Sequence, residues 1–129
     1  MRLIGDFYNV VEALPPAQGM VCGFRIRLNA GHMIYRAHFP GHPVTPGVCL
    51  IQMVSELAEE ALGVPLAIGG VKNVKFTDVV SPVTDSELCM AFTALTESDD
   101  GTLKVQAQLL AADNPARVFS KFSMTLRKK

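Results

Sequence analysis

The sequence lacks an excess of charge of either sign, because twelve lysine and arginine residues balance twelve aspartate and glutamate residues. A neutral chain has no overall electrostatic reason to bind nucleic acid or a membrane surface, so we expect neither as a partner. The chain also lacks an apolar run long enough to span a bilayer, and Asp6 interrupts the N-terminus before such a run forms. We therefore expect no signal peptide and a cytoplasmic protein.

Cysteine is scarce, and its spacing excludes two common kinds of site. Cys22, Cys49 and Cys89 are odd in number and widely separated, which is unlike a disulfide framework, and no CxxC pair suggests zinc. The three histidines also lack the spacing of a metal site. We expect buried free thiols in a reducing compartment and no bound metal.

The sequence does contain ample apolar material: 49% of its 129 residues are hydrophobic, which supports one domain covering residues 1–129. Several segments alternate between apolar and polar residues, as half-buried strands do. In the last of them, Phe122, Met124 and Leu126 are expected to face the core. The predicted strands cover residues 24–28, 32–37, 71–76, 87–96, 103–111 and 117–127.

Residues 48–62 differ, because their apolar residues recur with a helical period. The apolar stripe consists of Leu50, Val54, Leu57, Ala58 and Ala61. The opposite, polar stripe consists of Gln52, Ser55, Glu56, Glu59 and Glu60. The simplest interpretation of these acids is a solvated helix face.

Signals for both ends of this helix are present in the sequence. Thr45 is placed to cap the N-terminus, Pro46 fits the first helical position, and Gly63 follows the last turn. One helix among strands joined by tight turns predicts an α+β fold, in which a long antiparallel sheet packs against the helix.

The loop before the helix reads HFPGHPVTPGV over residues 38–48 and contains the candidate chemistry. Its prolines and glycines make it stiff, and it leads directly into the helix N-terminus. There the amides of Gly47 and Val48 have no intrahelical acceptor, so they can stabilise a carbonyl oxygen that gains negative charge. His38, at the start of the loop, is a candidate base near that oxygen.

This loop closely resembles the signature HFPxxPxxPGV of bacterial 3-hydroxyacyl-acyl-carrier-protein dehydratases, hotdog proteins in which a central helix follows the loop. Residues 73–76 (NVKF), followed by residues 80–82 (VSP), are similar to the family's strand and turn after that helix. The resemblance implies a hotdog fold. It also implies dehydration of (3R)-hydroxyacyl thioesters to trans-2-enoyl thioesters, in fatty acid or polyene-type lipid biosynthesis.

The resemblance further implies roles for individual residues. His38 matches the histidine that removes the C2 proton, and Gly47 matches the glycine whose amide polarises the thioester carbonyl. The neighbouring positions expected to bind substrate are Phe39, Pro40, Val44, Pro46 and Val48. No metal, flavin or nucleotide cofactor is implied. The implied partners are an acyl carrier protein or coenzyme A thioester, and a second copy of the chain in a homodimer or a multiple of dimers.

The position that carries an acid in this family, fourteen residues after the histidine, is Gln52 in this chain. Glutamine can hydrogen-bond a hydroxyl but cannot donate a proton as an acid does, and losing a general acid costs about 10²–10⁴-fold in rate. Three explanations stay open. Gln52 positions the hydroxyl while His38 shuttles the proton. Alternatively Glu56, one turn further along the same face and expected in the substrate-binding set, reaches the site directly or through water in place of the missing acid. Or the chain binds acyl thioesters without efficient dehydration.

Two rival functions remain beside the dehydratase. A hotdog thioesterase would use the same helix-end site with water as the nucleophile. A non-catalytic acyl-binding subunit would pair with an active homologue, which Gln52 favours and the intact His38 opposes.

Residues outside the motif have simpler interpretations. His32 and His42 are expected at the surface, and Cys49 is expected to pack in the core although it lies near a helix start. A basic rim for an acidic carrier protein is expected from residues on predicted strands or their ends, namely Arg25, Arg27, Arg36, Lys72 and Lys75.

Overall fold

The computed structural model describes residues 2–37 and 41–129. In this part of the chain, six strands form one antiparallel sheet in the spatial order β1-β2-β4-β5-β6-β3. In chain order the elements are β1 (Tyr8–Leu14), β2 (Cys22–Leu28), α1 (Met33–Ala37), α2 (Gly47–Leu62), β3 (Leu66–Phe76), β4 (Glu87–Glu97), β5 (Thr102–Ala111) and β6 (Asn114–Lys128).

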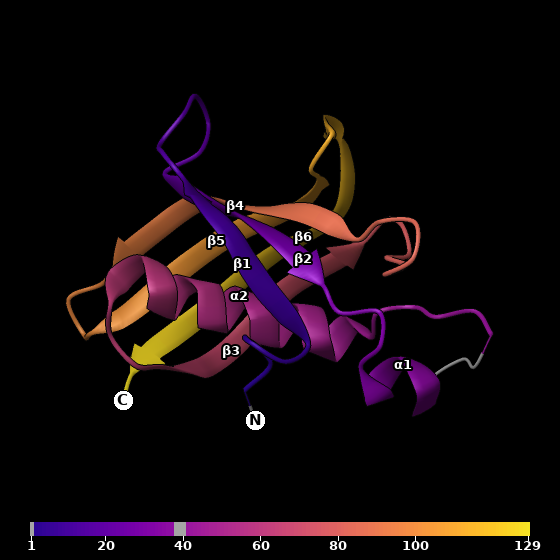
Figure 1. Ribbon diagram of the computed structural model, residues 1–129. Helices are drawn as coiled ribbons and strands as arrows, with labels where there is room; N and C mark the ends of the chain where they lie inside the picture. Colours follow the sequence, from indigo (N-terminus) through magenta and orange to yellow (C-terminus); the bar gives the residue numbers. More distant parts are fainter. Residues whose placement is uncertain (1, 38–40) are drawn as a thin grey trace.

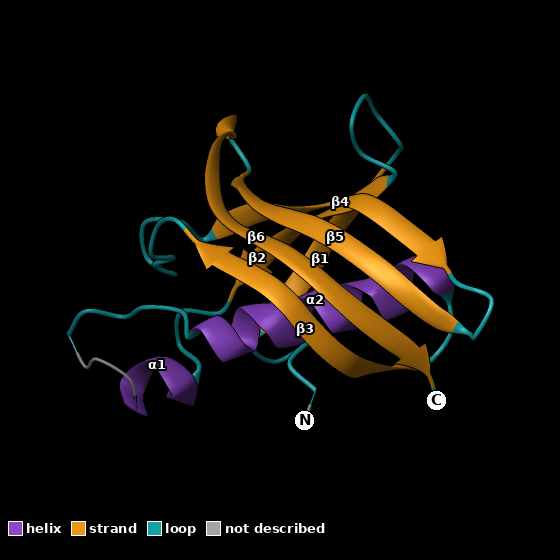
Figure 2. Cartoon of the chain, turned by 180° about the vertical axis from the view of Figure 1, so that it is seen from behind, coloured by secondary structure: helices purple, strands orange, loops and turns teal. Residues whose placement is uncertain are grey.

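The sheet curves around α2. Figure 1 shows β1 and β2 crossing one side of this helix, and Figure 2, seen from behind, shows β3 and β6 crossing the other. The helix buries Leu50, Val54 and Leu57, each at most 2% exposed. The sheet contributes large buried side chains to the same core, namely Ile26, Met90, Phe92, Leu109, Phe122, Met124 and Leu126. The predicted α+β arrangement is confirmed, as is the inward face of β6.

One predicted strand is wrong, because α1 occupies most of residues 32–37. The turn before it sets the direction of the chain: Gly31 N–H donates to Asn29 Oδ1 (3.0 Å), and His32 N–H donates to Asn29 O (3.1 Å). Tyr35 is the buried residue of α1, and its ring stacks on Phe7 at 5.1 Å. A segment with one buried side chain can be a helical turn as well as a strand. The alternation of apolar and polar residues over 32–37 therefore does not distinguish the two.

The edge strand β1 carries no alternation that would predict it. Of its residues only Tyr8 is buried, and the register with β2 shifts between Val10 and Glu12. An edge strand with an irregular register exposes both of its faces in part, which removes the period of two from the sequence.

The two ends of α2 differ in how well the sequence predicts them. Pro46 is the N-cap, and within the described chain no side chain caps the helix. Thr45, the predicted cap, instead shares a hydrogen bond with the Tyr35 hydroxyl (2.8 Å). At the other end Gly63 adopts the left-handed conformation (φ 69°), and its N–H donates to Glu59 O, as predicted.

Ala61 was predicted to face the core but is exposed. The last turn of α2 borders an open groove, which it shares with Leu14 and Phe24 of β1 and β2, so the sheet does not close over it. Among the described residues no helix is both long and apolar enough to cross a membrane.

Candidate functional site

The start of α2 is shaped by contact with the end of β3. A side chain on Gly47 would place its Cβ only 2.7 Å from Cζ of Phe76, so glycine is what allows this ring to lie against the first turn. The first turn leaves the amides of Gly47 and Val48 without helical acceptors. Val48 and Phe76 are 68% and 50% exposed, so the side chains beside these amides form an apolar surface. Phe76 belongs to residues 73–76, which resemble the family's strand after the helix, but the sequence alone predicts no role for it in the site.

The loop between α1 and α2 is held at both of its described ends. His38, Phe39 and Pro40, expected as base and substrate contacts, lie outside the described residues. Before them, Tyr35 is buried, and after them Thr45 is buried; their hydroxyls are hydrogen-bonded to each other at 2.8 Å. Burial raises the pKa of Tyr35 to about 12, although the hydrogen bond to Thr45 opposes the shift. The described ends of the loop are thereby fixed to one another.

The Thr45 end of the loop is also tied to the turn after β3. The N–H of Thr45 donates to Val80 O at 2.8 Å, and Val80 is buried. Val44 and Pro46, expected to bind substrate, are partly buried on either side of this bond. The stretches around residues 44–48 and 76–80, which carry the resemblance in the sequence, therefore meet in space.

Gln52, the residue at the acid position, is partly buried one and a half turns beyond the helix start. A rise of about 1.5 Å per residue puts it about 7.5 Å along the axis from Gly47. Its side-chain amide donates to Glu56 Oε2 at 3.0 Å. Gln52 and Glu56 thus form a pair on the same face of α2.

Glu56 is not on a solvated face, contrary to the simplest interpretation of the polar stripe, because it is 0% exposed. The N-terminal segment, residues 3–8, covers it. Leu3 N–H donates to Oε2 (2.7 Å), and Ile4 N–H (2.8 Å) and the Tyr8 hydroxyl (3.0 Å) donate to Oε1. Burial, followed by the charge of Glu56 and this hydrogen bond, raises the pKa of Tyr8. Nothing local in the sequence of α2 signals this covering.

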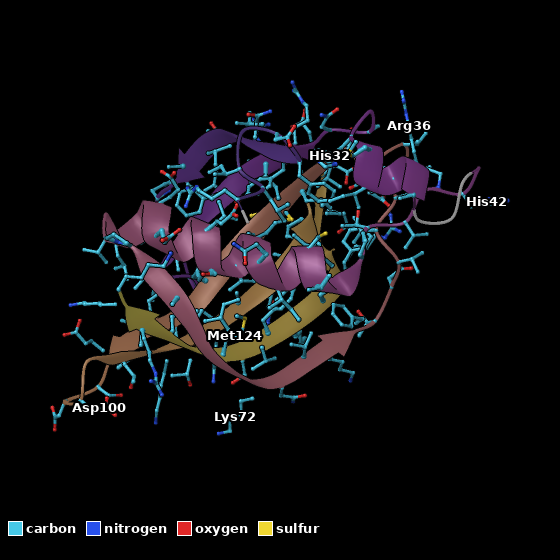
Figure 3. The ribbon with its side chains drawn as sticks, turned by 90° about the horizontal axis from the view of Figure 1, so that it is seen from below. His32, Arg36, His42, Lys72, Asp100 and Met124 are labelled. Atoms are coloured by element: carbon cyan, nitrogen blue, oxygen red, sulfur yellow. The ribbon has the colours of Figure 1, made fainter. Side chains whose placement is uncertain are left out.

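The remaining predicted residues fall in several places. His42 is exposed, and Figure 3 shows it at the end of the molecule near α1. The side chain of His32 is only 11% exposed: it contacts Asp6 (3.0 Å) and the edge of the Phe7 ring, so its predicted surface position is wrong. Cys49 is 3% exposed and burial raises the pKa of its thiol, which confirms packing rather than reactivity.

The five residues of the expected basic rim are not equivalent. Arg25 lies within 3.4 Å of Glu12, and Arg27 within 2.7 Å of Glu87, so both are ion-paired on β2. Arg36 lies in α1 rather than on a strand, and Figure 3 shows it projecting from the molecule far from Lys72. A continuous rim of all five residues is therefore not formed within one chain.

Comparison with known proteins identifies relatives of this arrangement. A model of the ApeI dehydratase family matches residues 17–113. A 3-hydroxyacyl-[acyl-carrier-protein] dehydratase FabZ of Levilactobacillus brevis is 31% identical over 83 residues, which are 59% of this chain and 55% of that protein. The FabZ of Lactiplantibacillus plantarum is 30% identical over 94 residues, covering 64% and 63%. The chain thus spans little more than half the length of the first of these curated relatives.

Solved structures agree with the fold. The dehydratase heterocomplex ApeI:P from Xenorhabdus doucetiae aligns with 92% of this chain and 96% of its own, with a TM-score of 0.66 and 21% identity. An uncharacterized protein from Erwinia carotovora subsp. atroseptica aligns with 83% of this chain and 82% of its own, with a TM-score of 0.60 and 20% identity. The hotdog fold is confirmed, and with the family model matching most of the chain, this protein belongs to the ApeI-like dehydratase family.

Proposed function

We propose that this chain acts on (3R)-hydroxyacyl thioesters carried by acyl carrier protein and takes part in their dehydration to trans-2-enoyl thioesters. One observation supports this most strongly. The family's loop leads into a helix whose first-turn amides, at Gly47 and Val48, lie beside the apolar surface of Phe76. A thioester carbonyl at this position would meet donors where its oxygen gains charge.

The proposed chemistry is a proton transfer followed by loss of water. His38 takes the proton from C2 while the Gly47 amide stabilises the enolate-like oxygen of the thioester. The electron pair of the C2–H bond then forms the C2=C3 double bond, and the C3–O bond breaks. The leaving hydroxide takes a proton, which His38 can return to it, so that water leaves and the base is regenerated.

Gln52 is proposed to orient the C3 hydroxyl rather than to protonate it. An amide can accept or donate a hydrogen bond but has no acidic proton to give. Glu56 has no exposed atom and already accepts bonds from residues 3–8, so direct proton donation by Glu56 is disfavoured. Of the two explanations in which this chain is active, we therefore propose the first, in which Gln52 orients the hydroxyl.

Assembly through the edge strand β3 is proposed as well. Among the described strands β3 pairs with β6 alone, and its side chains Ile68 and Val71 are exposed. A second copy or a related hotdog subunit would cover this edge. Gln52, together with the heterocomplex formed by a structural relative, favours one second candidate function: an acyl-binding subunit that works beside an active partner.

Incubation of the purified chain with 3-hydroxyacyl carrier protein, followed by the absorbance of the enoyl product, tests the proposal. We expect product from the chain alone and a stable dimer by light scattering. An inactive chain that becomes active only with a second hotdog protein would support the subunit function instead. A free thiol released without enoyl product would indicate a thioesterase and contradict both.

Carrier binding is a separate part of the proposal. Lys72 and Lys75 lie on β3 and are exposed, and because side chains stand off the faces of a sheet, a second subunit paired at the backbone edge of β3 need not cover them. Arg25 and Arg27, in contrast, are ion-paired. We expect charge reversal of both lysines to weaken carrier binding at low salt more than reversal of both arginines, because paired charges attract a partner less. Equal effects of the two double variants would show that these lysines do not form the docking surface.

A further inference from the structure

The carboxylate of Glu56 is the meeting point of four donors among the described residues. Oε1 accepts from Ile4 N–H and the Tyr8 hydroxyl, and Oε2 accepts from Leu3 N–H and the Gln52 amide. A carboxylate offers only acceptor sites, and its two oxygens can take all four of these bonds.

This arrangement fixes which way the Gln52 amide faces. Its NH2 group must point to Glu56, because the opposite orientation would set the amide oxygen against a carboxylate oxygen 3.0 Å away. The amide oxygen consequently lies on the other branch of the side chain, away from Glu56. A group that meets that oxygen must donate a hydrogen bond, as a substrate hydroxyl can.

We propose that Glu56 is a positioning residue, which orients the Gln52 amide for the C3 hydroxyl of the substrate and is itself held in place by the N-terminal segment, residues 3–8. The inference rests on the proposed function for the identity of the substrate. The positioning itself follows from the described contacts among Gln52, Glu56 and residues 3–8.

Glu59 provides a matched control on the same helix. Its carboxylate also accepts a partly buried hydrogen bond from the backbone N–H of Leu66 (2.7 Å), and it forms an ion pair with Arg2 at 2.9 Å. These partners join α2 to β3 and to Arg2 near the N-terminus without involving Gln52. A role that is structural alone would make Glu59→Gln and Glu56→Gln resemble each other in every measurement.

The two positions are predicted to respond as a unit. Glu56→Gln leaves one acceptor oxygen and one NH2 group, so the amide of Gln52 should turn to present its oxygen to that NH2 group. Gln52→Glu places a second carboxyl group about 3 Å from Glu56, and two carboxyls that close do not both ionise readily. The double variant Gln52→Glu/Glu56→Gln restores one carboxylate and one amide, so the introduced carboxylate can ionise and can accept a proton from a water that attacks C3.

Nuclear magnetic resonance of the side-chain amide of Gln52 tests the orientation without any assay of activity. The resonance is assigned by its loss in Gln52→Glu. We expect Glu56→Gln to shift it and to speed its hydrogen exchange, while Glu59→Gln leaves it unchanged. An unchanged resonance in a folded Glu56→Gln chain overturns the proposal. If Glu56→Gln does not fold, Gln52→Glu decides alone: its introduced carboxyl should titrate above an ordinary glutamate, and an ordinary titration overturns the proposal.

Hydration of an enoyl thioester, the reverse of the proposed reaction, measures the effect of these variants on activity. We expect the double variant to exceed Gln52→Glu by at least about tenfold in kcat with little change in KM, because hydration needs a base for the attacking water, and only the double variant has a carboxylate at position 52 that ionises without a second carboxyl beside it. Equal rates for the two variants would contradict the positioning role. Absence of activity in every variant counts against the proposed function, and the resonance measurements then decide on the positioning by themselves.

Discussion

The first turn of α2 and the turn that carries Gln52 and Glu56 are stabilised in different ways. The first turn is organised by neighbours in the sequence, with Pro46 as its cap, and by the close approach of Phe76 to Gly47. The second is organised by residues 3–8, about fifty positions away in the chain. A local motif can thus specify free amides at the start of a helix, while a distant segment fixes the side chains one to two turns further along the same helix.

The largest expected effect is on activity, and it should differ between a variant in the loop before α2 and a variant in the turn that carries Gln52. His38→Ala should lower hydration activity by about 10²–10⁴-fold or more, because it removes the proposed base, whereas Gln52→Ala should cause a smaller loss. Enoyl absorbance with both variants measures the difference. Retention of activity in His38→Ala would refute the assigned base, and a loss in Gln52→Ala as deep as in His38→Ala would give the amide a larger role than orientation.

Glu56→Leu should break the second turn by removing the shared acceptor. Two backbone N–H groups and the Tyr8 hydroxyl would lose their partner beneath the N-terminal segment, so we expect a loss of about 3 kcal/mol in the free energy of unfolding. Urea denaturation measures it. Glu60→Leu, at an exposed position one turn on, is the control and should change stability by less than about 0.5 kcal/mol. Similar values for both would mean that the buried carboxylate is not what holds the segment.

Gly47→Ala tests the first turn of α2. Unlike Glu56→Leu, it should affect activity more than stability. The new Cβ would meet the Phe76 ring at 2.7 Å, and this half-exposed ring can swing aside over the amides. We expect activity to fall by about tenfold and stability to change by less than about 1 kcal/mol. Adding Phe76→Ala to Gly47→Ala should recover part of the activity. No recovery would indicate that the ring is not what obstructs the site.

The smallest expected effect distinguishes the two faces of the first turn. The thiol of Cys49 is buried and its pKa is raised by burial, so it should remain protonated and react slowly with iodoacetamide at neutral pH. Mass spectrometry of the native chain against the urea-unfolded chain measures the protection. Equal rates in the two states would show that the inner face of this turn opens readily.

Much of the fold could be predicted because its signals are local. The helix period, Gly63 as its C-cap and the alternation of β6 each depend on residues a few positions apart. α1, in contrast, depends on Tyr35 meeting Phe7 from another part of the chain, and β1 is a mostly exposed edge. Alternation of apolar and polar residues cannot reveal either of these.

The candidate site also has one part that the local sequence predicts and another part that depends on distant residues. The loop motif predicts Gly47 and Val48 at the helix start, and the structure places both there. The burial of Glu56 could not be predicted, because its donors are two backbone amides and one phenol, and backbone amides leave no trace in a sequence. Thr45 bonds to Tyr35 instead of capping the helix. This could not be predicted either, because Tyr35 belongs to another element.

The order of the sheet has a consequence for a chain emerging from the ribosome. α2 is complete before β4, β5 and β6 are made, and β3 must wait for its partner, since Leu66 pairs with Lys128. Until β6 is synthesised, the sheet can form only from β1, β2, β4 and β5, and the side of the helix that β3 and β6 cross stays uncovered. Nascent chains that stall within β5 should therefore be bound by chaperones or aggregate, whereas release of the whole of β6 should let the sheet close in a single cooperative step.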